Sequence, residues 1–477
     1  MSCFLAQRPT VWMRRLAAWL VVAIAFAMAG CAHRFVNRPA TTYDRNAGYR
    51  FRNTPPSPLN SDEIFVILAF SGGGTRAAAF SFGAMEKLAA TMISFGGQER
   101  RLLDEVDIIS SVSGGSFTAA YYGLHREGLF ADFPEKFLYR NVTAGLARRV
   151  LNPLRWPSFA SARYARIDAA AEYYDDEVFG GKTFADLVAQ HARPFIVLNA
   201  TDMSYVSRFE FTQDQFDLIG SDLGTYPIAR AVAASSAFPV LLTPLTLANH
   251  PHPPDYRPPV WIADALSDRQ AAPREYAVAR VSQSYLDPVA RPYVHVMDGG
   301  IADNIGLRGP AYALTSTQGL WSLRSLINSK IKYLVIIAVN AKPGGLAAWD
   351  QRAAAPGVTD VLSTVMNGPM GNYSDETIQY VRDTIETWRQ DVENSREIAR
   401  LRGDPLPPLR EVKFYAAELT FQDVRDAAER DYLNGLATSF DLPRADIDRL
   451  RAAAARLIDE SPDVQRLLAD LRRTSQE

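Results

Sequence analysis

Mostly apolar runs of strand length recur between residues 62 and 345, and stretches of helical character separate them. The runs occupy residues 64–70, 106–109, 195–199 and 333–339. Strands that are apolar along their whole length are buried on both faces, which is typical of a parallel sheet covered by helices on each side. The pattern therefore predicts an α/β fold over residues 62–345, with a mostly parallel central sheet flanked by helices.

After about residue 345 the pattern changes to helical periodicity. Two groups of apolar residues each fall on one face of a helix: Ile378, Val381, Ile385, Trp388 and Val392, and then Val464, Leu467, Leu468 and Leu471. Ser374 is expected to cap the first helix, and Ser461, which precedes Pro462, the second. Residues 346–477 are predicted to form a mainly helical extension. Its apolar faces either pack onto the preceding domain, which we favour, or bind lipid or a partner.

The N-terminus has the layout of a signal peptide over residues 1–30. Arginines precede an apolar run over 16–28, which is shorter than the roughly 18 residues of a membrane-spanning helix. The run ends in Met28-Ala29-Gly30-Cys31, which resembles a bacterial lipobox. Cys31 is therefore expected to carry lipid, palmitate included, as the first residue of the mature chain. Ordinary signal cleavage and an uncleaved anchor are the alternatives.

Attachment at Cys31 would place the protein in the cell envelope, with the membrane as a partner. Ala32 follows Cys31 in place of the aspartate that signals retention at the inner membrane, so we expect the outer membrane, on its periplasmic side. Residues 31–61 include a proline-rich stretch at 53–58. They are predicted to form a tether that lets the following domain move relative to the membrane.

Composition restricts the chemistry further. Among 477 residues only Cys3 and Cys31 are cysteines, so a mature chain that begins at Cys31 has no thiol for a metal site or a disulfide. The sequence contains no zinc or calcium motif, and we expect neither a metal nor a cofactor. The formal net charge is −2 and no basic stripe is present, so nucleic acid is not expected as a partner.

The most informative motif is a serine in a turn between a strand-like run and a helix-like stretch. Ser111-Val112-Ser113-Gly114-Gly115 follows the run at 106–109 and precedes small residues. This is the layout of a nucleophile elbow, where the serine hydroxyl projects from a turn so sharp that only small residues fit around it. The motif predicts acyl transfer through Ser113. A serine- and glycine-rich turn without chemistry is the alternative.

A second motif places Gly72, Gly73 and Gly74 between the run at 64–70 and a helix-forming stretch. Backbone N–H groups without side chains can converge on an anion, as the oxyanion of a tetrahedral acyl intermediate requires. A phosphate-binding loop fits poorly, because neither a Gly-Lys-Ser/Thr ending nor G-x-G-x-x-G spacing is present. A plain tight turn is the remaining alternative.

A serine nucleophile also needs a base. Asp298 ends a strand-like stretch and precedes Gly299 and Gly300. None of the six histidines has a context that marks it as a base, and His295 is expected to be packed in the core. Because ligands of parallel sheets bind at the carboxyl ends of strands, Asp298, Ser113 and the glycines are expected in one crevice.

Together these segments resemble the patatin-like phospholipases, in the order of that family's motifs. The matching segments are Gly-Gly-Gly-Thr-Arg at 72–76, the elbow around Ser113, the Ala/Ser-rich stretch at 233–239 that ends in proline, and Asp-Gly-Gly at 298–300. The elbow departs from the family's pattern at Ser111, where the usual residue is glycine. The resemblance implies a patatin-like fold and a Ser–Asp dyad, with Ser113 as nucleophile and Asp298 as base. It also implies an oxyanion hole at Gly72, Gly73 and Gly74, joined by the amide of Gly114, with Arg76 as the family's basic residue.

The function that this resemblance implies is a serine acyl hydrolase that acts on phospholipids or other acyl esters. A non-catalytic protein of the envelope that binds or transfers lipid is one alternative, and a hydrolase of small esters or peptides is another. An apparent insertion before Asp298 begins with a proline-rich stretch at 250–259. It is expected to form either a lid or rim beside the site or a plain surface loop.

Overall fold

A computed structural model describes residues 35–159, 164–239, 241–270, 272–315, 331–344, 348–403 and 412–474. Its main sheet has the order β10-β9-β1-β4-β5-β8-β7, with β6 also paired to β5. The strands are β1 (Ile64–Phe70), β4 (Val106–Val112), β5 (Phe195–Asp202), β6 (Ser207–Glu210), β7 (Leu245–Ala248), β8 (Tyr293–Asp298), β9 (Tyr333–Asn340) and β10 (Lys413–Thr420). Strands β10, β9, β1, β4 and β5 are parallel, whereas β6, β7 and β8 pair antiparallel. The prediction of a mostly parallel sheet flanked by helices is confirmed.

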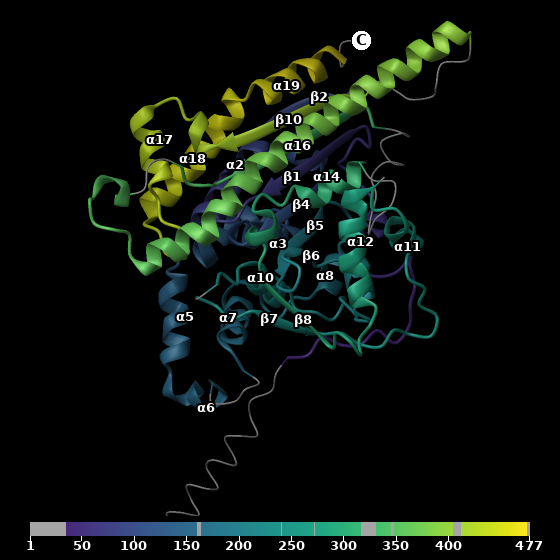
Figure 1. Ribbon diagram of the computed structural model, residues 1–477. Coiled ribbons are helices and arrows are strands. Elements are labelled where there is room, and N and C mark those ends of the chain that lie inside the picture. Colours follow the sequence, from purple (N-terminus) through teal and green to yellow (C-terminus); the bar gives the residue numbers. More distant parts are fainter. Residues whose placement is uncertain are drawn as a thin grey trace, which may run out of the picture.

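Helices surround this sheet (Figure 1). They are α2 (Gly74–Ala90), α3 (Gly114–His125), α4 (Gly128–Phe133), α5 (Val142–Leu151), α6 (Trp156–Phe159), α7 (Arg166–Tyr174), α8 (Phe184–Ala189), α9 (Gln213–Asp217), α10 (Ile228–Ser235), α11 (Val260–Ser267), α12 (Pro273–Tyr285), α13 (Gly300–Asp303), α14 (Arg308–Thr315), α16 (Val358–Arg402), α17 (Ala427–Asn434), α18 (Arg444–Glu460) and α19 (Pro462–Thr474). A short hairpin, β2 (Met92–Phe95) and β3 (Gln98–Arg101), lies apart from the main sheet.

The two faces of the sheet are covered by helices from different parts of the chain. On β9, Tyr333 hydrogen-bonds Thr474 of α19, while Ile336 and Ala338 lie beside Val381 of α16. Successive residues of a strand point to opposite faces, so α19 and α16 cover opposite sides of the same strands. Figure 1 shows α16 running along the length of the sheet.

The C-terminal region is mainly helical, as predicted, but it is not an extension of the preceding domain. Strand β10 adds an edge strand beside β9, and α18 packs along α2. A Cβ at Gly83 of α2 would lie 2.5 Å from the Cα of Arg451, which shows how closely the two helices approach. Residues 413–474 therefore complete the α/β domain, which corrects the boundary expected at residue 345.

One of the two expected helix caps is wrong. Helix α16 already begins at Val358, and the Ser374 hydroxyl donates to the carbonyl of Met370 within that helix. Ser461 does separate α18 from α19 and accepts the N–H of Val464 at 3.5 Å. The apolar face that begins with Val464 is buried, so it packs onto the domain as favoured.

The segment before β1 is not a free tether. Asn37 hydrogen-bonds Ser221 at 2.9 Å, Arg50 forms a buried ion pair with Asp214 at 2.7 Å, and Tyr49 is part of the core. The tether expected over 31–61 is therefore wrong for residues 37–54, because their side chains have specific partners in the domain. The signal peptide and Cys31 lie outside the described residues.

The insertion before Asp298 is likewise folded. His250 contacts the carbonyl of Asn37, and His252 contacts the carbonyl of Leu218 and stacks on Tyr256. These contacts fix the proline-rich stretch against the N-terminal segment and the end of α9. Within the described ranges, no helix has both the length and the apolarity to cross a membrane.

Candidate active site

Ser113 occupies the sharp turn between β4 and α3. Its backbone has φ of 50° and ψ of −118°, a conformation that a residue with a side chain rarely adopts. Such a backbone costs about 1–3 kcal/mol and persists only where its surroundings hold it. The Ser113 N–H donates to the hydroxyl of Ser235 at 2.9 Å, and the side chain is only 7% exposed. The sequence-based prediction of a strand–turn–helix elbow is confirmed.

The pairing of three strands brings Asp298 to this turn. Val112 lies opposite Asn199 in the β4–β5 pair, and the next residue of β5, Ala200, lies opposite Asp298 in the β5–β8 pair. Ser113 and Asp298 therefore end their strands at the same level, although β8 runs antiparallel to β5. The Ser113 hydroxyl donates to Oδ2 of Asp298 at 2.9 Å.

The carboxyl group of Asp298 is buried and fixed from both sides. Its Oδ1 accepts the N–H of Gly300 at 2.8 Å, and its backbone carbonyl accepts the Thr201 hydroxyl at 2.7 Å. Burial raises the pKa of Asp298 to about 6, although the hydrogen bonds from Gly300 and Ser113 act in the opposite direction. Asp298 is therefore ionised at neutral pH, and it is a stronger base than an exposed aspartate.

The C-terminal end of α10 connects the Ser113 turn to the turn at Asp298. Besides accepting from Ser113, the Ser235 hydroxyl donates to the carbonyl of Asn199 at 2.6 Å and contacts the Ser116 hydroxyl at 2.9 Å. The carbonyls of Ser235 and Ala237 accept the N–H groups of Gly299 and Asp298. The sequence indicated Ser235 only as part of the Ala/Ser-rich stretch of the resemblance, where its polar side chain among alanines was the available signal.

The glycine loop lies directly against the elbow. A Cβ at Gly72 would lie 3.3 Å from the Cβ of Ser113, and one at Gly114 would lie 2.0 Å from the carbonyl oxygen of Gly74. No residue other than glycine fits at Gly114 without moving the loop. Gly73 has φ of 141° and Gly74 has φ of 61°, values that glycine adopts without strain.

The candidate oxyanion donors differ from the expected set at one position. The N–H of Gly72 already donates to the carbonyl of Asn304 at 3.0 Å. That hydrogen bond removes Gly72 from the donors and leaves Gly73, Gly74 and Gly114, whose N–H groups lie at the starts of α2 and α3. Helix N-termini carry partial positive charge, which favours an anion there.

The sequence is similar to a known protein family. A model of the patatin-like phospholipases matches residues 68–310, just over half of the sequence. The chain belongs to the patatin-like phospholipase family. No curated protein matches its sequence.

Two solved structures are similar at low identity. Human GIVD cytosolic phospholipase A2 has a TM-score of 0.41 and 14% identity, over 87% of this chain and 63% of that one. VipD from Legionella pneumophila has a TM-score of 0.26 and 12% identity, over 90% of this chain and 71% of that one. The chain thus spans less than two thirds of the length of the human enzyme.

Arg76, the basic residue of the patatin-like motif, points away from the dyad into the C-terminal segment. Its Nε donates to the carbonyl of Ala341 at 3.0 Å, and its Nη atoms donate to the carbonyl of Leu436 and the hydroxyl of Thr438. Burial without a carboxylate lowers its pKa to about 10. Arg76 therefore joins the glycine loop to residues 436–438.

The histidine nearest to Asp298 does not face the patatin-like site. Val294, Val296 and Asp298 are buried on one side of β8, so His295 projects from the other side. There it is exposed and contacts the Thr246 hydroxyl at 3.0 Å. The expectation of a core histidine is wrong, because the outer face of this antiparallel edge is open to solvent.

Proposed function

We propose that the protein is a serine acyl hydrolase that cleaves acyl esters of membrane lipids, phospholipids foremost, with Ser113 and Asp298 as a catalytic dyad. The observation that carries the proposal is the 2.9 Å hydrogen bond between the Ser113 hydroxyl and a buried carboxylate, in a strained turn of a patatin-like phospholipase. A protein that only bound acyl chains would have no use for either group.

In the proposed reaction, the Ser113 oxygen attacks the ester carbonyl carbon while its proton passes to Asp298. The negative charge that develops on the carbonyl oxygen is stabilised by the N–H groups of Gly73, Gly74 and Gly114. The tetrahedral intermediate collapses, the alcohol leaves with the proton from Asp298, and an acyl-serine remains. Water then gives a proton to Asp298 and attacks the acyl-serine. As the fatty acid is released, Asp298 returns that proton to the Ser113 oxygen, which restores both groups.

The proposal is tested by incubating the purified mature protein with mixed phospholipid vesicles and measuring released fatty acid and lysolipid by mass spectrometry. Equimolar release of the two products is expected. Binding of the vesicles without any release would instead favour a lipid-binding or transfer protein. Turnover of soluble short-chain esters alone would favour a small-ester hydrolase.

Replacing Ser235 by alanine is expected to lower kcat by about 10- to 100-fold with little change in KM. The variant loses the acceptor that holds the Ser113 N–H, and small displacements of a nucleophile are costly to the chemical step. The rate of Ser113 labelling by a fluorophosphonate should fall in parallel. Ser236→Ala is the matched control, because that hydroxyl donates to the carbonyls of Val232 and Ala233 in its own helix rather than holding the elbow. Equal losses in the two variants would contradict the positioning role.

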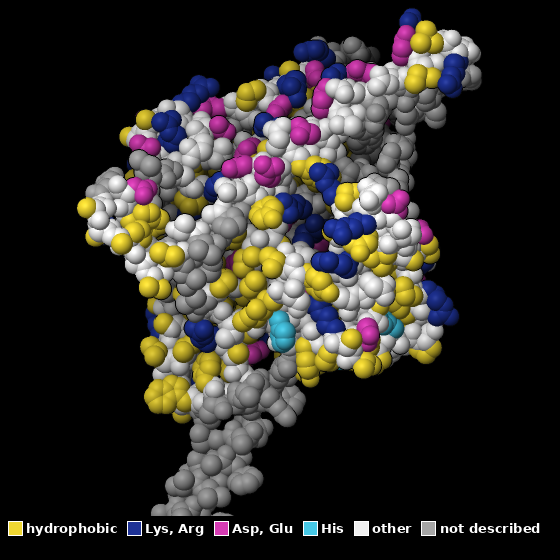
Figure 2. All heavy atoms as spheres, in the orientation of Figure 1, with side chains coloured by type: hydrophobic (Ala, Val, Ile, Leu, Met, Phe, Trp, Pro, Cys, Tyr) yellow, Lys and Arg dark blue, Asp and Glu magenta, His cyan; other side chains and the backbone are white. Residues whose placement is uncertain are grey.

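We further propose that the mature chain is attached to the envelope membrane, at its periplasmic face, by lipid on Cys31. The first described residue, Phe35, packs under Arg230, and Arg230 pairs with Asp168 of α7. Because α5 packs against α7, these contacts place the N-terminal end of the described chain on the side of the domain that carries α5. The tip between α5 and α6 exposes Leu151, Leu154 and Trp156, which suits contact with a lipid surface. Figure 2 shows apolar side chains gathered at this end.

Cells that express the protein with labelled palmitate are expected to incorporate label into wild type and not into Cys31→Ser. The wild-type chain should partition into detergent, since several acyl chains anchor a protein far more firmly than one. Cys3→Ser is the matched control, because that cysteine would be removed with the signal peptide. Unchanged labelling of Cys31→Ser would refute the attachment and leave the serine chemistry untouched.

A further inference from the structure

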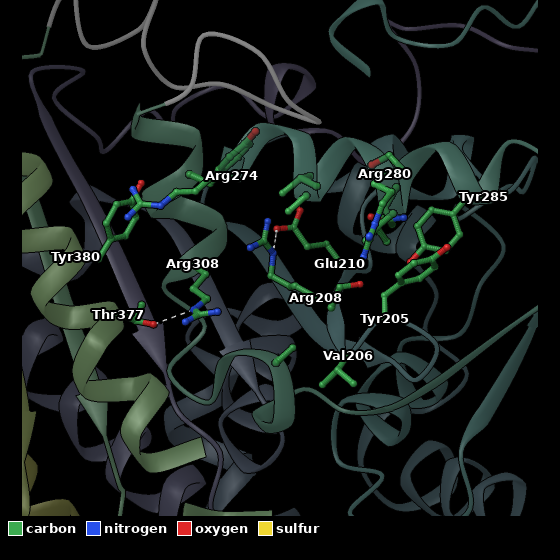
Figure 3. A pocket seen from close by; sticks show the side chains of 18 of the residues that line it. Tyr205, Val206, Arg208, Glu210, Arg274, Arg280, Tyr285, Arg308, Thr377 and Tyr380 are labelled. Atoms are coloured by element: carbon green, nitrogen blue, oxygen red, sulfur yellow. Dashed lines mark hydrogen bonds and ion pairs between the residues drawn. The ribbon is translucent and has the colours of Figure 1, made fainter. Parts of the chain in front are cut away.

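A cavity of about 500 Å³, apart from the Ser113–Asp298 pair, opens between β6, α12, α14 and α16 (Figure 3). None of its described lining residues is Ser113, Asp298 or a glycine of the loop. It borders the patatin-like site through Ala302 of α13, whose N–H donates to the Thr201 hydroxyl. The cavity is thus a separate compartment that the proposed hydrolysis does not use.

The lining of this cavity carries an excess of positive charge. Four arginines line it, Arg208, Arg274, Arg280 and Arg308, against the two carboxylates of Glu210 and Glu376. Figure 3 shows the labelled arginines arranged around the cavity, and Figure 2 shows basic side chains gathered where α12, α14 and α16 meet. Among the lining residues the arginines therefore outnumber the carboxylates by two, and the buried carboxylate of Asp303 also interacts with Arg208 and Arg308.

Three of these guanidinium groups contact neutral partners, and one of the three, Arg280, lies over the ring of Tyr205 at 5.6 Å. Arg208 pairs with Glu210 at 2.8 Å, but Arg274 stacks on Tyr380 at 4.2 Å, and Arg308 donates to the Thr377 hydroxyl at 3.0 Å. In the ranges that the structure describes, no carboxylate lies within ion-pair distance of Arg274, Arg280 or Arg308. Guanidinium groups that form no ion pair with a described carboxylate favour the binding of an anion.

Two polar atoms of the lining also indicate that the cavity holds a ligand. Nε2 of Gln215 and Oγ of Ser207 are buried and have no hydrogen-bond partner within the described chain. Gln215 is only 4% exposed, so solvent does not readily compensate for the missing acceptor. A buried donor without an acceptor costs about 1–3 kcal/mol, which a ligand oxygen in the cavity would recover.

The remainder of the wall is apolar. Val278 and Val281 of α12 and the ring of Tyr285 line the cavity beside the arginines. We propose that this cavity binds an anionic amphiphile, with a phosphate group among the arginines and an adjoining hydrocarbon part against α12. A phosphate monoester carries about 1.5–2 negative charges at neutral pH, and the excess of arginines over carboxylates in the lining favours such an anion.

Isothermal titration calorimetry of the mature chain with octyl phosphate tests the proposal, since this probe has no ester to hydrolyse. Wild type is expected to bind it, whereas Arg274→Gln/Arg280→Gln should bind at least tenfold more weakly. Both replaced side chains are exposed at the rim, so the fold should persist. The control variant Arg38→Gln/Arg148→Gln removes the same charge from exposed sites elsewhere and should bind as wild type does.

Inorganic phosphate and octyl glucoside separate the two halves of the ligand, and both are expected to bind at least tenfold more weakly than octyl phosphate. If inorganic phosphate bound as tightly as octyl phosphate, the proposed role of the hydrocarbon part would be wrong. If octyl glucoside bound as tightly as octyl phosphate, the proposed role of the anionic group would be wrong. Unchanged binding in the Arg274/Arg280 variant, or an equal loss in the control variant, would overturn the site itself. None of these readouts depends on whether Ser113 is catalytic.

Discussion

Ser113→Ala is expected to reduce ester hydrolysis on the order of 10⁴-fold or more, because removal of a serine nucleophile eliminates the covalent pathway altogether. The variant should fold normally, since alanine fills the same turn and the Ser113 N–H still donates to Ser235. A fluorophosphonate probe should label wild type at residue 113 and leave the variant unlabelled. Released fatty acid, the labelled peptide and the thermal midpoint measure the three expectations.

A buried serine outside the site provides the control for that variant. The Ser81 hydroxyl of α2 is buried and has no hydrogen-bond partner within the described chain, so Ser81→Ala removes a hydroxyl without removing a contact. It should retain both activity and labelling. Full activity in Ser113→Ala, or labelling of a different serine, would refute the assignment of the nucleophile.

Asp298→Asn is expected to lower kcat/KM by about 10³-fold or more, because the amide has the shape of the carboxylate and cannot accept the serine proton. Its oxygen can still accept the Gly300 N–H, so the local fold should be retained. His295→Gln is the control and should cost little, since that side chain projects from the opposite face of β8. A loss in His295→Gln as large as that in Ser113→Ala, in a folded protein, would favour a histidine-dependent mechanism.

The raised pKa of Asp298 should give the proposed hydrolase a characteristic pH dependence. Asp298 acts as a base only when it is ionised, so kcat/KM should be level above pH 6 and fall about tenfold per pH unit below it. An exposed aspartate, with a pKa near 3.9, would retain activity to about pH 4. A kcat/KM profile that stays level from pH 7 to pH 4 would contradict the burial of the base.

The sequence was most informative about the fold and the site where an apolar run ends directly in small residues. The runs at 64–70 and 106–109 are apolar because both faces of β1 and β4 are buried, and each ends in small residues because helices begin there at once. These two facts predicted the sheet and placed Ser113 beside the glycines. The position of Asp298 at the same level required knowledge of the β5–β8 pairing, which no local pattern contains.

The errors arise from contacts between distant segments. Strand β10 alternates between buried and partly exposed residues at an edge of the sheet, so it lacks the apolar run that revealed β9. The Gly72 N–H is occupied by Asn304, more than two hundred residues away. Likewise, residues 37–54 are packed through contacts with distant residues such as Ser221 and Asp214, which no local pattern reveals.

The contact between the glycine loop and the C-terminal region has a consequence for biosynthesis. The Thr75 N–H donates to the carbonyl of Ser439, and Arg76 donates to Leu436, so the loop acquires these partners only after almost the whole chain has been made. A nascent chain therefore contains both Ser113 and Asp298 long before the glycine loop is held in place. If the chain is exported as proposed, the hydrolase would be inactive while it crosses the membrane, because its glycine loop would not yet be in place.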